Sequence, residues 1–168
     1  MASAGPQLAT ARVVPATPAD LDACAALMVA TALWQRYGVT LDGGRRTLIA
    51  AADHGGHILV AWVGDEVAGF VLVYPRGGFA RSGYVRLIGV AAAFQGQGIG
   101  DALMAAAESL VAGLAPDMFL LVSDFNIDAQ RFYQRLGYVQ VGALPAYVLS
   151  DVTELILWKK LHQHIEDG

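Results

Sequence analysis

The stretch 84-YVRLIGVAAAFQGQGIGDALMAAAESL-110 contains the strongest structural signal in this sequence. An apolar run ends at Val90, a glycine-rich turn follows at residues 95–100, and Ile99 and Leu103 begin a repeat at helical spacing. Glycine adopts positive φ easily and lets a ligand approach the backbone closely. A helix start exposes unpaired N–H groups and a partial positive charge. The order strand, glycine turn and helix therefore predicts a binding site for an anion, such as a phosphate.

Composition restricts the class of protein. The chain has 168 residues, of which 55% are hydrophobic and 15% are charged, and its formal net charge is −4. This length and apolar content indicate one domain with a sizeable core rather than a disordered chain. The negative charge gives no support for a nucleic-acid partner. No apolar run reaches the roughly 18 residues of a membrane span.

The single cysteine, Cys24, excludes an intrachain disulfide and fits a cytoplasmic location. It repeats with other apolar residues at helical spacing, so we interpret it as a core residue rather than a nucleophile. The first residues lack the pattern of a signal peptide. We interpret residues 1–11 as a flexible leader and residues 162–168 as a polar tail, whose two histidines are not expected to bind a metal.

Residues 12–161 are predicted to form one domain of mixed α/β, or α+β, class. Helices are expected over residues 17–38, 45–53, 99–110 and 127–136. Strands are expected over residues 12–16, 58–63, 67–74, 84–90, 118–122, 138–141 and 154–159. The second and third strands form a hairpin across residues 64–66, so we expect a central, mostly antiparallel sheet of about seven strands with four helices.

Residues 95–100 have three possible interpretations: a Walker loop, a dinucleotide site or a purely structural turn. A Walker loop requires Lys followed by Ser or Thr after its last glycine, whereas Gly100 is followed by Asp101 and Ala102. A dinucleotide site requires Gly-x-Gly-x-x-Gly, and counting from Gly96 places Asp101 at the third glycine. Both patterns fail, which disfavours a nucleotide-binding regulatory domain. A purely structural turn remains the alternative.

The glycine turn and a second motif resemble the GCN5-related N-acetyltransferase (GNAT) family. The family signature Gln/Arg-x-x-Gly-x-Gly/Ala corresponds here to 95-QGQGIG-100. The downstream family pattern Asn-x-x-Ala-x-x-aromatic-Tyr-x-x-Leu-Gly-Phe/Tyr corresponds to 126-NIDAQRFYQRLGY-138. The two segments occur in the family's order and separation, and the resemblance spans roughly residues 12–160.

The resemblance implies a fold in which the parallel strands ending near Val90 and Val122 splay apart around acetyl-CoA. The pantetheine arm would lie along one strand, and backbone amides of the glycine turn would bind the pyrophosphate. Asn126 matches a pantetheine-contacting asparagine, and it can also cap a helix. The cofactor-binding residues that the resemblance implies are Ile88, Gly89, Val90, Gln95, Gly96, Gln97, Gly98, Ile99, Gly100, Asp101 and Asn126. Many relatives carry Arg or Lys inside this turn, where this chain has Gly96 and Gln97.

Tyr133 and Asp124 are the candidate catalytic residues. Tyr133 matches the family's frequent general-acid tyrosine, and helical spacing places it on one face with Asn126 and Ala129. The alternative is a tyrosine that only packs. Asp124 is the carboxylate nearest to the end of the expected strand 118–122, where some relatives carry a glutamate base. It could instead cap the helix that begins near Asn126.

The acceptor is expected between the first helix and two later loops. Trp34, Tyr37, Phe79, Arg81 and Tyr147 lie in these segments, and the glycine-rich loop 75–83 is predicted to act as a lid. These observations favour an N-acetyltransferase that uses acetyl-CoA as co-substrate, without a metal, to acetylate a small-molecule amine or a protein amino group. A homodimer is compatible with this interpretation, whereas nucleic-acid and membrane partners are not expected. The alternative is an acyl-CoA-binding module without catalysis, because the expected strands 84–90 and 118–122 carry no carboxylate.

Overall fold

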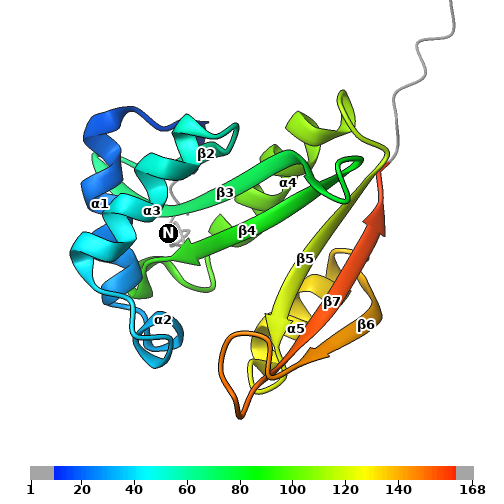
Figure 1. The fold of residues 1–168 in the computed structure, drawn as a ribbon. Helices are drawn as coiled ribbons and strands as arrows, with labels where there is room; N and C mark the ends of the chain where they lie inside the picture. The colour runs from blue at the N-terminus through cyan, green and yellow to red at the C-terminus, as the bar shows by residue number, and fades with distance from the viewer. Residues whose placement is uncertain (1–9, 162–168) are drawn as a thin grey trace, which may run out of the picture.

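Seven strands form one mixed sheet in the computed structural model, which describes residues 10–161 (Figure 1). They are β1 (Arg12–Pro15), β2 (His57–Val63), β3 (Glu66–Gly78), β4 (Ser82–Val90), β5 (Asp117–Ser123), β6 (Val139–Pro145) and β7 (Thr153–Lys160). Their order in the sheet is β1-β2-β3-β4-β5-β7-β6. Only β4 and β5 pair in parallel, and every other neighbouring pair is antiparallel. The predicted tail and most of the predicted leader lie outside the described residues.

The helices cover both faces of this sheet. They are α1 (Leu21–Val29), α2 (Ala32–Arg36), α3 (Leu41–Asp53), α4 (Ile99–Ala112) and α5 (Ile127–Arg135). One buried cluster joins α1, α2 and α3 to β2 and β3 through side chains such as Leu48 and Phe70. The other joins α4 and α5 to the opposite face through side chains such as Leu103 and Tyr133. None of the helices within residues 10–161 combines the length and the hydropathy that crossing a bilayer requires.

The strands β4 and β5 pair over a short distance and then separate (Figure 1). Their parallel pairing covers only Gly83–Val85 opposite Met118–Leu120. Beyond this point β4 stays paired with β3 as far as Val90, and β5 stays paired with β7 as far as Ser123. Leu72 of β3 pairs with Leu87, and its neighbour Val73 pairs with Val85. Arg86 is therefore an extra residue in β4 and forms a β-bulge. Such bulges bend a strand, so the sheet opens at the place where this one occurs.

The predicted strands, the mixed sheet and the splayed parallel pair are confirmed, and two details of the prediction are wrong. The first predicted helix is two helices, because Thr31 has extended backbone angles (φ −98°, ψ 126°) between α1 and α2. The predicted loop over residues 75–83 is mostly strand, since β3 continues to Gly78 and β4 begins at Ser82. The turn between them has positive φ at Phe79 and Ala80 (53° and 56°), although neither residue is a glycine.

Helix α2 lies directly against the backbone of β4 because residue 89 is glycine. A Cβ atom built at Gly89 would lie 2.6 Å from Cη2 of Trp34 and 2.9 Å from Cδ2 of Leu27. Trp34 is buried and stacks on Phe70 with ring centroids 5.8 Å apart. The absence of a side chain at Gly89 therefore lets the indole pack directly on the β4 backbone, and this sets the distance between helix and sheet.

Gly89→Ala is expected to destabilise the protein by about 1–3 kcal/mol, because the added methyl overpacks the Trp34 site. The measurement is the free energy of unfolding by urea. Gly113→Ala is the matched control, since its φ is −77° and a Cβ there meets no atom within 4 Å. Equal unfolding free energies for the two variants would contradict this account of the helix–sheet contact.

Candidate functional site

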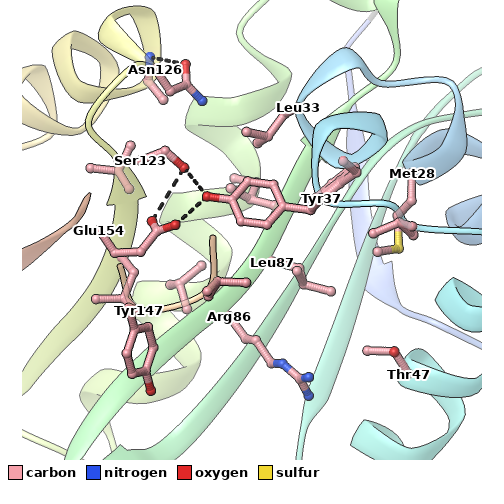
Figure 2. Close-up of a pocket in the computed structure, with 18 of the residues that line it drawn as sticks. Met28, Leu33, Tyr37, Thr47, Arg86, Leu87, Ser123, Asn126, Tyr147 and Glu154 are labelled. Atoms are coloured by element: carbon pink, nitrogen blue, oxygen red, sulfur yellow. Dashed lines mark hydrogen bonds between the residues drawn. The ribbon is translucent and has the colours of Figure 1, made fainter. Parts of the chain in front are cut away.

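A pocket of about 540 Å³ lies where β4 and β5 separate (Figure 2). Its walls come from both sides of the sheet: α1, α2 and α3 with their connections, the strands β4 and β5, the helix α5, and the β6–β7 loop. The lining residues include Leu33, Trp34, Tyr37, Tyr84, Arg86, Leu87, Ile88, Ser123, Asn126, Tyr133, Tyr147, Val148 and Glu154. Because β4 and β5 do not pair here, the backbone edges of both strands beyond Val85 and Leu120 are available to a ligand.

The side chains of Ser123 and Glu154 face the side of the sheet that carries α2. Successive side chains on a strand point to opposite faces. Their neighbours Val122 and Leu155 pack into the cluster with α4 and α5. Ser123 and Glu154 are also paired across β5 and β7, so the strand register itself brings these two polar residues together.

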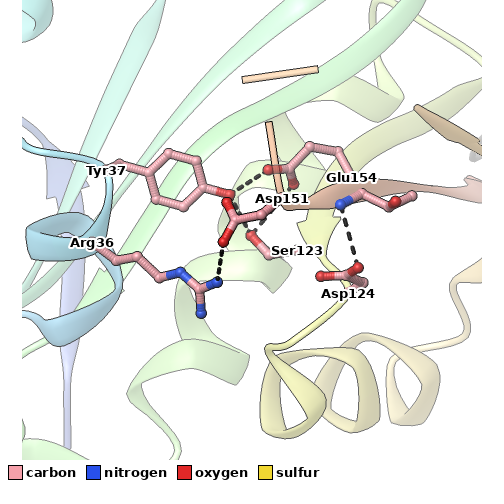
Figure 3. A network of polar contacts seen from close by, with 7 residues as sticks. Arg36, Tyr37, Ser123, Asp124, Asp151 and Glu154 are labelled. Atoms are coloured by element: carbon pink, nitrogen blue, oxygen red, sulfur yellow. Dashed lines mark hydrogen bonds and ion pairs between the residues drawn. The ribbon is translucent and has the colours of Figure 1, made fainter. Parts of the chain in front are cut away.

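Tyr37 completes a hydrogen-bonded cluster with these two residues (Figure 3). Its hydroxyl donates to Oε1 of Glu154 and lies 2.7 Å from Oγ of Ser123. Ser123 Oγ in turn donates to Oε2 of Glu154 over 3.4 Å. Burial, and then the hydrogen bond to Glu154, raise the pKa of the Tyr37 hydroxyl, which keeps it a donor at neutral pH.

Glu154 is a buried carboxylate, with only 5% of its surface exposed. Within residues 10–161 no lysine, arginine or histidine forms an ion pair with it. Sequence reasoning missed this residue, because it sits alone in the apolar strand 153-TELILWKK-160. An acidic residue in such a strand is a usable signal, but only the pairing with Ser123 places it in the pocket.

The end of α2 is connected to the opposite wall by a second set of contacts. The Arg36 guanidinium lies 3.7 Å from the Asp151 carboxylate in the β6–β7 loop. It also stacks over the Phe125 ring at 3.8 Å from the centroid. Tyr147, in the same loop, lines the pocket and is 61% exposed. Trp34, Tyr37 and Tyr147 therefore line the same pocket, and their role in binding the acceptor stays a prediction.

The glycine turn has the backbone geometry of an anion-binding site. Gly96 and Gly98 have φ of +74° and +79°, and Gly98 is the N-cap of α4. The N–H of Ala102 bonds to the Gly98 carbonyl, so the amides of Ile99, Gly100 and Asp101 precede the first helical hydrogen bond. Because α4 connects the parallel strands β4 and β5, its N-terminus lies at the edge of the sheet where these strands separate.

Two residues at the start of α4, Gly100 and Asp101, contact side chains of α5. The Asp101 carboxylate lies 3.4 Å from the Arg135 guanidinium of α5, so its negative charge is partly offset. A Cβ at Gly100 would lie 3.1 Å from Cζ of Phe132. Gly100 therefore has a packing role between α4 and α5 in addition to any role at an anion site.

Asn126 and Tyr133 both line the pocket, from the α5 side. Asn126 Oδ1 accepts a hydrogen bond from the Ala129 N–H at 3.3 Å, so it caps α5 as well as facing the pocket. Tyr133 is 6% exposed and packs against Phe132 and Tyr138 at centroid distances of 5.1 and 5.9 Å. Burial raises the pKa of Tyr133 well above its ordinary value, so the phenol is protonated at neutral pH.

Several predicted site residues are placed elsewhere. Asp124 is exposed, is not among the lining residues, and accepts a hydrogen bond from the Thr153 N–H at 3.3 Å. Phe79 and Arg81 lie in the turn between β3 and β4, next to the paired end of β4 and β5 rather than the open end. Phe79 is 87% exposed and contacts Phe119 edge to face. The predicted lid is therefore a hairpin tip away from the pocket.

Cys24 lies in the core and is not among the residues that line the pocket. Cys24 is fully buried in the core, and burial raises the pKa of its thiol to about 12, so it is not a thiolate nucleophile. In the part of the chain that the structure describes, no three His, Cys, Asp or Glu side chains gather as a metal ion would require.

The sequence matches one family model, and the fold is similar to that of several solved structures. The model of the "Acetyltransferase (GNAT) family" matches residues 24–138. A search of curated protein sequences gave no match. An aminoglycoside 6'-N-acetyltransferase complexed with coenzyme A has a TM-score of 0.76 and 18% identity, over 90% of this chain and 97% of that chain. Ard1 from Thermoplasma volcanium has a TM-score of 0.75 and 21% identity, over 90% and 98%. A nourseothricin acetyltransferase has a TM-score of 0.60 and 28% identity, over 66% and 68%.

Proposed function

The chain belongs to the GNAT acetyltransferase family, and we propose that it transfers an acetyl group from acetyl-CoA to a primary amine by direct attack on the thioester. The observation that carries this proposal is the pocket between β4 and β5, which has Asn126 and Tyr133 on one side of the sheet and the Tyr37–Ser123–Glu154 cluster on the other. A donor and an acceptor can thus approach the same opening from opposite faces.

Acetyl-CoA fits the groups that this opening presents. The backbone edge of Ile88, Gly89 and Val90 has no β5 partner and can pair with the amide groups of a pantetheine arm. The residues from Gly96 to Asp101 offer backbone amides and the helix dipole to the pyrophosphate, whereas the Gln95 amide donates to the Ala92 carbonyl. One structural neighbour was crystallised with coenzyme A, which supports the same donor here.

The reaction requires three proton transfers. A lysine-type ammonium has a pKa about three units above neutral and must lose a proton before its nitrogen can attack. The nitrogen then bonds to the thioester carbon, the C–S bond breaks, the nitrogen loses a second proton to become an amide N–H, and the departing thiolate takes a proton. Tyr133 is the proposed donor, since its protonated phenol lines the pocket on the α5 side.

A panel of primary amines tests the function directly. The purified protein with acetyl-CoA is expected to release free CoA thiol, in proportion to acetylated amine, with at least one class of amine. Thiol detection and mass spectrometry of the product measure this. Tight acetyl-CoA binding without transfer to any amine would reject the enzyme and leave an acyl-CoA-binding module.

The predicted pyrophosphate site is tested at Gly98. Gly98→Val should weaken acetyl-CoA binding by at least about tenfold, because a side chain there obstructs the backbone amides. The measurement is calorimetry. Gly55→Val is the matched control, since Gly55 also has positive φ (+85°) with no atom within 4 Å of a built Cβ, but precedes β2. An equal loss in both variants would mean that backbone strain alone, rather than a lost binding site, explains the result.

Tyr133→Phe keeps the packed ring and deletes the hydroxyl. It should lower kcat by about 10²–10⁴-fold while acetyl-CoA affinity stays nearly constant, as expected for an acid–base residue. Steady-state rates with the best amine of the panel, and calorimetry with acetyl-CoA, measure the two effects. An unchanged kcat under conditions where the chemical step limits the rate would show that solvent protonates the thiolate.

A further inference from the structure

Glu154 is a buried carboxylate that lines the pocket. No lysine, arginine or histidine within residues 10–161 forms an ion pair with it. Its two oxygens accept hydrogen bonds from the hydroxyls of Tyr37 and Ser123. A carboxylate offers about four lone-pair sites, so about two remain for a ligand. Burying an unpaired charge costs stability, and a cation that enters the pocket would offset this cost. The site is therefore complementary to a positively charged ligand.

We propose that Glu154 binds the ammonium group of the acceptor and accepts its proton, with Tyr37 and Ser123 holding the carboxylate in place. This inference rests on the proposed acetyl transfer. It adds that the acceptor carries a positive charge and that Glu154 is the residue that binds it. The ammonium gives one proton to a Glu154 oxygen, which leaves a neutral amine with a free electron pair. That pair attacks the thioester carbon, and the C–S bond breaks as the nitrogen loses its second proton to solvent and the thiolate takes a proton from Tyr133. Glu154 releases its proton to solvent after the product leaves.

The rest of the acceptor side indicates what carries the ammonium. Within residues 10–161, Glu154 and Arg86 are the charged residues that line the pocket, and Figure 2 shows Arg86 directed away from Glu154. Several of the other lining residues are apolar or aromatic: Leu33, Tyr37, Leu87, Tyr147 and Val148. A single ammonium on an apolar or aromatic carbon chain fits this combination, whereas a second cationic group would face the Arg86 guanidinium.

Two isosteric probes separate charge recognition from general damage to the site. The first is 2-phenylethylamine, which is an ammonium ion at neutral pH. The second is O-benzylhydroxylamine, which has the same length and ring but an uncharged amino group at neutral pH. Glu154→Gln should lower kcat/KM for 2-phenylethylamine by about 10²-fold or more. It should leave kcat/KM for O-benzylhydroxylamine within about threefold, since this nucleophile needs neither a counter-charge nor a base before attack.

Matched variants provide the controls. Glu66→Gln makes the same change at an exposed position in the β2–β3 hairpin and should alter neither rate. Asp124→Asn tests the rival carboxylate, and it should change the two rates equally if at all. Tyr37→Phe should lower the rate with 2-phenylethylamine several-fold more than the rate with O-benzylhydroxylamine, because it affects only how the carboxylate is held.

Stability gives a readout that is independent of turnover. The Gln carbonyl oxygen can accept from the Tyr37 hydroxyl and its NH2 group can donate to Ser123 Oγ. The change also removes a buried charge, so the thermal unfolding midpoint of Glu154→Gln should equal or exceed that of the wild type. A large fall in this midpoint would assign Glu154 to the fold instead. If Glu154→Gln does not fold, Tyr37→Phe decides by the same comparison of the two probes.

The outcomes distinguish this inference from the proposed function. A wild-type protein that acetylates no amine rejects both. Equal losses with the two probes in Glu154→Gln, or a selective loss in Asp124→Asn instead, overturn the role of Glu154 while acetyl transfer stands. A wild type that acetylates other amines of the panel but not 2-phenylethylamine overturns the apolar acceptor.

Discussion

The functional geometry of this protein depends on the early end of the pairing between β4 and β5. Three residue pairs join these strands, and beyond them each strand keeps only its outer partner. Hydrogen-bonding groups that a continuous sheet would use internally are therefore left for a ligand. The bulge at Arg86 lies at this point, and bulges bend strands and interrupt pairing. The opening also connects the two faces of the sheet, so groups that arrive on different helices line one pocket.

The two faces contribute different chemistry to this pocket. The α5 side supplies the buried phenol of Tyr133, which suits a leaving thiolate. The backbone amides at the start of α4, which suit a phosphate, lie outside the lining of the pocket. The α2 side supplies the carboxylate of Glu154, which suits a cation. The contact between Trp34 and Gly89 holds α2 close to β4, and this places Tyr37 within hydrogen-bonding distance of Ser123 on β5. The packing of α2 on the sheet thus determines the geometry of the proposed ammonium site.

Glu154 illustrates how a functional group can oppose stability. A buried carboxylate that has hydroxyl donors but no ion pair within residues 10–161 is more costly than a neutral side chain of the same shape. Proteins retain such groups where a ligand supplies the missing charge, and local conflicts with the rules of stable folding concentrate at functional sites. The same reasoning separates Glu154 from the Glu108–Lys159 pair, where both charges are satisfied inside the protein and no pocket is involved.

The sequence alone determined the fold class, the strand positions and the glycine turn at the start of α4, because these follow from local patterns of apolar spacing, glycine and helix starts. It also placed Asn126, Tyr133 and Tyr37 near one site, the first two through a linked motif. Only the tertiary structure decided that Phe79 and Arg81 lie in a hairpin turn, and that Asp124 binds the Thr153 amide instead of lining the pocket. It likewise revealed Glu154, which lies 31 residues from Ser123 and 117 from Tyr37. Local patterns carry no information about such distances, since the register of β5 with β7 and the docking of α2 on β4 are set by packing between distant segments.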